Sequence, residues 1–285
     1  MSRRRGIPSQ LAGGICLSVA GVFVCLSGCQ FFPQAEDLSS GLQSRRTTLP
    51  PLRADQEAIQ LDVLMIDRRA DDPLIGDRLW HELDQVGAVS AETRNVLNSN
   101  GLRVGHAASS PPPMLESLLA ANPRTSEPSR VSGRTYSIRS GTDLEVQASE
   151  LWPECDVSIF DKERVRNMQF DQVRGVFHVK PIRLQDGWVR VEFIPEIHHG
   201  DLRLRHVATE SGFANKTTQE VEKCFPQRFT VTLNVGESAV ITADADSEGT
   251  LGDRFFRRKE EGEPLQRLLI VRLVDMGRTI KPVDR

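Results

Sequence analysis

Residues 173–195 read VRGVFHVKPIRLQDGWVRVEFIP, and this stretch decides what kind of fold the chain adopts. Apolar side chains recur at alternate positions before its Asp-Gly pair, and after the pair Val189, Val191 and Phe193 alternate with charged residues. A period of two places these apolar side chains on one face of a β-strand, and Asp-Gly is a strong signal for a two-residue turn. The stretch therefore predicts an antiparallel hairpin with one buried face.

The chain beyond this hairpin keeps the same pattern. In residues 229–235, Phe, Val and Leu alternate with Thr and Asn, a Gly-Glu turn follows, and residues 239–241 are aliphatic. Residues 268–274 read LLIVRLV, which is apolar on nearly both faces and suits a central strand. We therefore predict a larger antiparallel β-rich domain over residues 134–276, followed by a short tail over 277–285.

The segment upstream shows helical as well as strand periodicity. Residues 59–66 read as a strand, residues 77–86 place apolar side chains at helical spacing, and Ser90 is of the type that caps a second short helix. These elements predict a small α/β module over residues 56–122, joined to the β-rich domain by a linker over 123–133. The predicted fold class is α+β: a small N-terminal α/β module followed by a larger antiparallel β-rich domain.

The N-terminus has the features of an export signal. Three arginines at positions 3–5 precede an apolar run over residues 11–26, which is shorter and richer in glycine than a membrane-spanning helix prefers. The run ends in LSGC at residues 26–29, which resembles the lipobox of bacterial lipoproteins. This resemblance implies removal of a signal peptide, residues 1–28, and attachment of lipid to the sulfur of Cys29. The alternative is an uncleaved membrane anchor with an incidental cysteine.

The lipobox resemblance also implies a location. Two or more acyl chains such as palmitate on Cys29 would anchor the protein stably, whereas one chain holds only marginally. Gln30, in the place where Asp would stand, favours the outer membrane by the same resemblance. Residues 29–55 are polar and contain prolines, and they predict a flexible tether for a folded part that faces the periplasm.

Two cysteines remain in the predicted folded part, Cys155 and Cys224. In an oxidising compartment a disulfide between them would close a long loop, which is worth about 4 kcal/mol in the chain-entropy model. The alternative is two free, buried thiols. The sequence leaves both open because it does not give the distance between the two residues.

The C-terminal third resembles a known family. The pieces that carry the resemblance are VEFIPEI at residues 191–197, LNVGESAVI at 233–241, and LGDRFF at 251–256 followed by LLIVRL at 268–273. In this order, across residues 173–276, they resemble the C-terminal β-domain of secretins, the outer-membrane channels of secretion and pilus systems. The Pro-rich turn that normally precedes the Leu-Gly pair and the Thr-Pro that normally follows the last strand are absent.

The resemblance has implications for fold and function. It implies that the strands near 176–194 and 229–241 pair in one antiparallel sheet. It also implies an association with a secretion or assembly system. A small lipoprotein with a secretin-like β fold that forms no channel fits the pattern equally well.

One cluster of residues offers a candidate for metal chemistry. Glu196, His198, His199 and His206 gather near a polar turn centred on Gly200. Zinc needs three or four converging ligands, and adjacent residues on a strand point to opposite faces. We therefore expect a solvated loop here and no metal, with these four residues as the candidates if the turn bends them together.

The net charge and the absence of certain motifs exclude some classes of function. Without the signal peptide, 33 basic residues face 39 acidic ones, so no nucleic-acid partner is expected. The sequence has no phosphate-binding glycine loop, and no cofactor is predicted. We predict a non-enzymatic envelope lipoprotein that scaffolds or contacts an envelope protein. The alternatives are a periplasmic hydrolase or metal-dependent enzyme, and a module that binds a small ligand.

Overall fold

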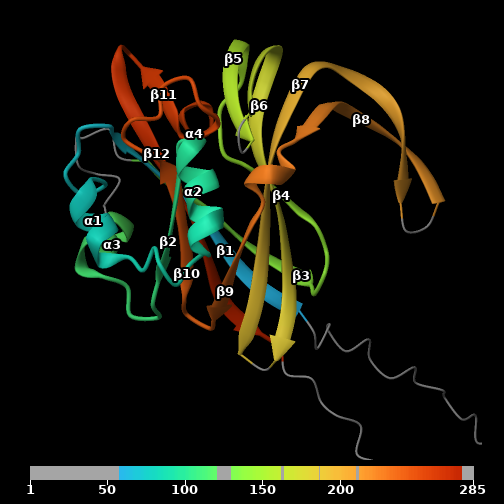
Figure 1. Cartoon of the computed structure of the whole chain (residues 1–285). Coiled ribbons are helices and arrows are strands. Elements are labelled where there is room, and N and C mark those ends of the chain that lie inside the picture. The colour runs from blue at the N-terminus through green and yellow to red at the C-terminus, as the bar shows by residue number, and fades with distance from the viewer. Residues whose placement is uncertain (1–57, 121–129, 162–163, 186, 210–211, 278–285) are drawn as a thin grey trace, which may run out of the picture. The chain divides into compact units, whose positions relative to one another are not determined.

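The computed structural model describes residues 58–120, 130–161, 164–185, 187–209 and 212–277, without the side chains of 205–209, 212–214 and 216. These residues form two antiparallel sheets and a few short helices (Figure 1). The first sheet has the order β2-β10-β12-β1-β3, with β11 paired to β12. Its strands are β1 (Ala58–Arg69), β2 (Leu102–Ala107), β3 (Arg130–Arg139), β10 (Ser238–Ala243), β11 (Arg257–Glu260) and β12 (Glu263–Met276).

The second sheet has the order β4-β6-β7-β8, with β5 paired to β6 and β9 paired to β7. Its strands are β4 (Leu144–Gln147), β5 (Trp152–Asp161), β6 (Arg164–Gln185), β7 (Trp188–Thr209), β8 (Gly212–Lys223) and β9 (Phe229–Asn234). The helices are α1 (Asp77–Glu82), α2 (Ala91–Ser99), α3 (Pro113–Leu119), α4 (Leu251–Phe256) and the 3-10 turn η1 (Phe225–Gln227). Gln185 pairs with Trp188 at the end of the β6–β7 hairpin, which confirms the hairpin predicted at the Asp-Gly pair.

The predicted α+β fold class is wrong, because the described chain is mostly strand and its helices are short. The strands of residues 56–122 do not form a sheet of their own: β1 pairs with β12 and β2 pairs with β10. The predicted helix at residues 77–86 ends at Glu82, and Val86 is exposed. Periodicity reports local structure, so it did not show that N-terminal strands complete a sheet with C-terminal ones.

The core lies in two layers. The larger layer lies between the two sheets and includes five phenylalanine side chains that contact one another: Phe177, Phe193, Phe229, Phe255 and Phe256. The smaller layer lies between the outer face of the first sheet and α1 and α3, which Figure 1 shows together beside that sheet. Both layers bury aliphatic and aromatic area, which is the main favourable term in folding.

Gly175 on β6 shows how closely the larger layer is packed. A Cβ atom at this position would lie 2.6 Å from a ring carbon of Phe255, so α4 packs against the backbone of β6. Close approach of a side chain to backbone is a reason for glycine inside a strand. The α4 helix therefore contributes its two phenylalanines to the larger layer.

The sheet pairing implied by the secretin resemblance is confirmed for β9 and wrong for β10. Strand β9 pairs with β7 in the second sheet, whereas β10 pairs with β2 and β12 in the first. The turn between them contains Gly236 at φ +93°, a conformation that glycine adopts without strain. The chain thus passes from one sheet to the other at the predicted Gly-Glu turn.

Candidate interaction surface

Strand β7 places Glu196 and His198 on the same face because they are two residues apart. Nε2 of His198 lies 3.1 Å from Oε2 of Glu196, and Nζ of Lys223 on β8 lies 3.0 Å from Oε1. The Glu196 side chain is 4% exposed. Burial raises its pKa, but the hydrogen bond with His198 and the ion pair with Lys223 outweigh burial and hold the pKa below the usual glutamate value. The cluster therefore ties β7 to β8 with an ionised carboxylate.

The other histidine candidates do not join this cluster. The ring of His199 packs against Phe170 on β6, with 4.4 Å between ring centroids, on the opposite face of β7. The side chain of His206 lies outside the described residues. Within the described part of the chain, no three His, Cys, Asp or Glu side chains come together in a way that could hold a metal ion. Opposite strand faces separate His198 and His199, as their adjacency predicts.

Cys155 and Cys224 are both free and buried in the structure. Burial raises the pKa of the Cys155 thiol and raises that of Cys224 to about 12. The thiolate is the reactive form of cysteine, so both side chains are protonated and unreactive at neutral pH. Cys29 lies outside the described residues.

The predicted polar turn at Gly200 is a bulge within a continuous strand. Strand β7 runs from Trp188 to Thr209, and its register with β8 shifts between His199 and Arg203. Gly200 takes φ +72°, which permits the irregularity without strain. A glycine next to an acidic residue is typical of turns, so the pattern did not distinguish a bulge from a chain reversal.

Beyond this bulge the second sheet divides. Strand β6 pairs with β7 from Gln185 back to Arg174, and its earlier part pairs with β5 instead. The far part of β7 pairs with β8. Figure 1 shows the β7–β8 hairpin reaching away from the two sheets. We call the described residues 199–209 and 212–220 of this hairpin the arm.

Gln219 on β8 holds the base of the arm. Its side-chain amide donates hydrogen bonds to the carbonyl oxygens of Gln172 and Gly200, at 2.6 and 2.8 Å. Its side-chain oxygen accepts one from Nε of Arg174, at 2.8 Å. Gln219 is buried and so connects β6, β7 and β8 at the point where β6 and β7 diverge. A fully hydrogen-bonded buried amide of this kind fixes the geometry of its neighbours.

A second contact holds the same base. Nη1 of Arg166 on β6 lies 3.0 Å from Oε1 of Glu222 on β8. With Gln219 and the Glu196–Lys223 pair, it fixes the direction in which the arm leaves the sheet. These base residues were not predicted from the sequence, because a glutamine in an alternating strand reads as a solvated side chain.

Past its fixed base, the arm exposes large apolar side chains. Leu202 is 64% exposed and Leu204 is 70% exposed. Leu204 pairs with Thr217, and the alternation of β7 puts Leu202 on the same face. Val221, at the base of β8, is also exposed and shares this face because it lies four residues along β8 from Thr217. An apolar patch on a projecting element marks a surface suited to protein contact.

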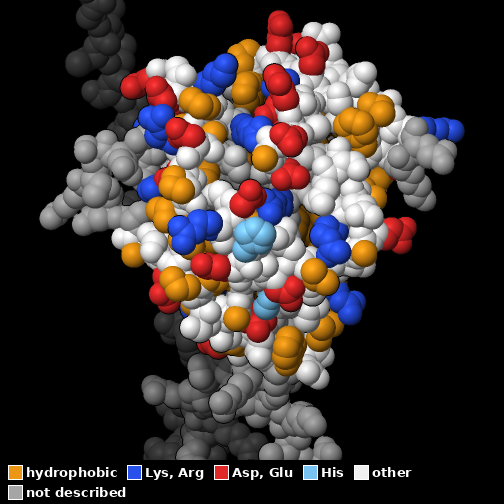
Figure 2. Space-filling model, turned by 60° about the vertical axis from the view of Figure 1, so that its left-hand side comes forward, with side chains coloured by type: hydrophobic (Ala, Val, Ile, Leu, Met, Phe, Trp, Pro, Cys, Tyr) orange, Lys and Arg blue, Asp and Glu red, His pale blue; other side chains and the backbone are white. Residues whose placement is uncertain are grey.

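Charge elsewhere on the surface is mixed. Figure 2 shows acidic and basic side chains interspersed over the face that includes α1 and α3. Nucleic-acid binding needs clustered Lys and Arg, and the face in Figure 2 has no broad basic patch. Within the described ranges, no helix is both long enough and apolar enough to cross a membrane.

Comparisons with known proteins add little. No family model and no curated protein matches the chain. A solved structure of the Klebsiella pneumoniae type II secretion system outer membrane complex, described as PulD, PulS and PulC HR domain, is similar at 13% identity and a TM-score of 0.22. The match covers 76% of this chain and 39% of that one. A TM-score this low does not establish a shared fold.

Proposed function

We propose that this protein is an envelope lipoprotein without catalytic activity, which contacts another envelope protein through its arm and belongs to a secretion or assembly system. The observation that carries the proposal is an arm fixed at its base with Leu202 and Leu204 exposed on one face. The membrane anchor at Cys29 and the place in a secretion or assembly system rest on the sequence resemblances and remain predictions.

The arm has the properties of a contact element. Burial of a leucine side chain is worth about 1.5–3 kcal/mol, so two leucines on one face supply a useful part of a binding free energy. Because Gln219 and the Glu196–Lys223 pair fix the arm in advance, little ordering entropy is lost on binding. Central apolar side chains in a fixed frame are the usual source of affinity at protein interfaces.

Crosslinking in the native envelope tests the proposal. A photoreactive amino acid at position 204 should give a discrete adduct with another protein, and L202D/L204D should lower recovery of that protein at least several-fold. Leu184, an exposed leucine at the β6–β7 hairpin, is the matched control. A photoreactive group at position 184 should give no such adduct, and L184D should recover the partner at the wild-type level. Equal loss with both variants, or no adduct from position 204, would contradict the arm as the contact.

The anchor needs a separate test. Intact mass of protein from native cells should show a chain that begins at Cys29 and bears two or three acyl groups. Cys29→Ser should abolish acylation and release the protein from membranes, while its circular dichroism spectrum stays unchanged. A mass that retains Met1 would contradict the lipoprotein assignment without bearing on the arm.

A further inference from the structure

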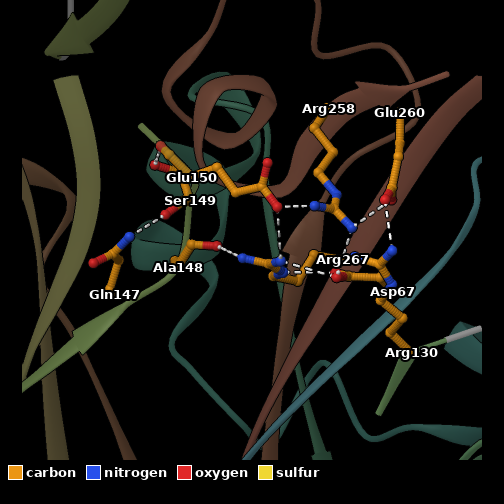
Figure 3. A network of polar contacts seen from close by, with 9 residues as sticks. All are labelled: Asp67, Arg130, Gln147, Ala148, Ser149, Glu150, Arg258, Glu260 and Arg267. Atoms are coloured by element: carbon orange, nitrogen blue, oxygen red, sulfur yellow. Dashed lines mark hydrogen bonds and ion pairs between the residues drawn. The ribbon is translucent and has the colours of Figure 1, made fainter. Parts of the chain in front are cut away.

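A buried network of charges lies where the first sheet meets the loop between β4 and β5 (Figure 3). Asp67 on β1 accepts two hydrogen bonds from Arg267 on β12: Nε to Oδ1 at 2.6 Å and Nη2 to Oδ2 at 2.9 Å. Nη2 of Arg258 on β11 lies 3.1 Å from Oδ2 of the same carboxylate. The three side chains are 9%, 14% and 13% exposed, so Asp67 is shared by two buried guanidinium groups.

The charges of Asp67, Arg258 and Arg267 do not balance without a further carboxylate. Two arginines and Asp67 leave one positive charge. Glu260 contacts Arg258 at 2.9 Å but also pairs with Arg130 at 2.7 Å, so these two surface charges offset each other. A partly desolvated positive charge is costly unless a negative group meets it.

Glu150 is the group that meets it. It lies in the loop between β4 and β5, and its carboxylate contacts Nη1 of Arg258 and lies 4.0 Å from Nη2 of Arg267. Its side chain is 57% exposed, in contrast to the two arginines. A half-exposed carboxylate from a loop therefore covers a buried pair of arginines that the sheet holds in place.

Three buried hydrogen-bond donors at the same place lack an acceptor among the described residues. Ser149, Glu150, Trp152, Arg257 and Arg258 are among the residues that line a cavity of about 10 Å³, room for about one water molecule. Nε1 of Trp152 and the Nε atoms of Arg257 and Arg258 are buried and have no acceptor among the described residues. Buried donors without an acceptor are rare in folded proteins and cost stability.

We propose that Glu150 occupies, as a tethered group, a carboxylate-binding site formed by Arg258 and Arg267, and that an acidic side chain of a partner protein takes its place on binding. A carboxylate fits better than a phosphate because a single negative charge completes the network, whereas a second one would face Asp67. Arginine is also the side chain best suited to planar carboxylates. The inference does not depend on the arm.

Removal of the tethered carboxylate tests the site. In Glu150→Ala, sodium acetate should raise the melting temperature by a few degrees relative to sodium chloride at equal ionic strength, because a ligand that binds the folded state stabilises it. The wild-type protein should show no acetate-specific shift in melting temperature, because the Glu150 carboxylate already occupies the site. Glu154→Ala, which removes an exposed glutamate on β5 from the same region, is the matched control and should behave like wild type. Glu150→Ser replaces the alanine variant if that one fails to fold.

Two further measurements identify the ligand. Arg258→Met in the Glu150→Ala background should abolish the acetate shift. A blocked peptide with one central glutamate should stabilise Glu150→Ala as acetate does, and a response to acetate alone would overturn the assignment to a partner side chain. A larger shift with inorganic phosphate, or equal shifts with acetate and chloride, would overturn the carboxylate site. These readouts need no partner, so their failure is distinct from a failure of the crosslinking test.

Discussion

The two halves of β7 have the same alternating pattern and very different surroundings. In the near half, Val189, Val191 and Phe193 are completely buried between the sheets. In the far half, Leu202 and Leu204 are largely exposed. Among the described strands, this half of β7 pairs only with β8. The apolar residues of the near half hold the fold together, and those of the far half are available for contact. A strand of this length therefore combines a structural segment with a binding segment.

The near half should be far more sensitive to truncation. Phe193→Ala should lower the free energy of unfolding by about 3–5 kcal/mol, because it removes a buried ring that stacks on Phe229 and touches Phe177. Denaturant unfolding measures the loss. Leu184→Ala, at an exposed leucine on the neighbouring strand, should change stability by less than about 0.5 kcal/mol. A small effect at Phe193 would contradict its place in the buried aromatic cluster.

The junction between the halves should respond next. Gln219→Ala leaves a half-buried guanidinium N–H of Arg174 and two carbonyl oxygens without their partner, and we expect a loss of about 1–3 kcal/mol. Hydrogen exchange should speed up mainly in the arm, because the core between the sheets is untouched. Thr217→Ala, an exposed change on the same face of β8, should leave exchange unchanged. Uniformly faster exchange would argue against a local role of Gln219 at the point where β6 and β7 diverge.

A smaller and pH-confined effect is expected at Glu196. Its pKa in the folded protein lies below the ordinary value of 4.5, so the ionised carboxylate stabilises the fold above that pH and this contribution is lost as the pH falls through the folded pKa. Glu196→Gln should therefore lose less stability than wild type when the pH is lowered below 4.5. Unfolding midpoints measured from neutral to acidic pH show the difference. Parallel curves for the two proteins would contradict the role of the His198 and Lys223 contacts.

Local features of this fold were predictable, and long-range ones were not. Ser90 caps α2 through a hydrogen bond from the backbone N–H of Thr93, as its residue type predicts, and the β6–β7 hairpin forms at the Asp-Gly pair. The pairing of β1 with β12 joins segments about two hundred residues apart, and nothing in either strand specifies the other. The predicted α+β class failed for this reason.

The candidate surface could not be predicted from the sequence for a related reason. The sequence named Glu196 and His198 only among four candidate metal ligands, and the role of Lys223 required the register of β7 against β8. Leu202 and Leu204 lie in the stretch that the sequence predicted as a solvated loop around Gly200, and alternation alone does not say whether another layer covers an apolar face. Exposure of an apolar face is a property of tertiary structure, so only the structure could identify the arm.

Truncation in the far half should leave stability almost unchanged and affect contact alone. Leu204→Ala removes a side chain that is 70% exposed, so the free energy of unfolding should change by less than about 0.5 kcal/mol. If the arm binds a partner, the same change should weaken capture of that partner several-fold, because a buried interfacial leucine is lost. Denaturant unfolding and quantitative capture on one preparation measure both quantities. A large loss of stability with unchanged capture would assign Leu204 to the fold and remove the distinction between the two halves of β7.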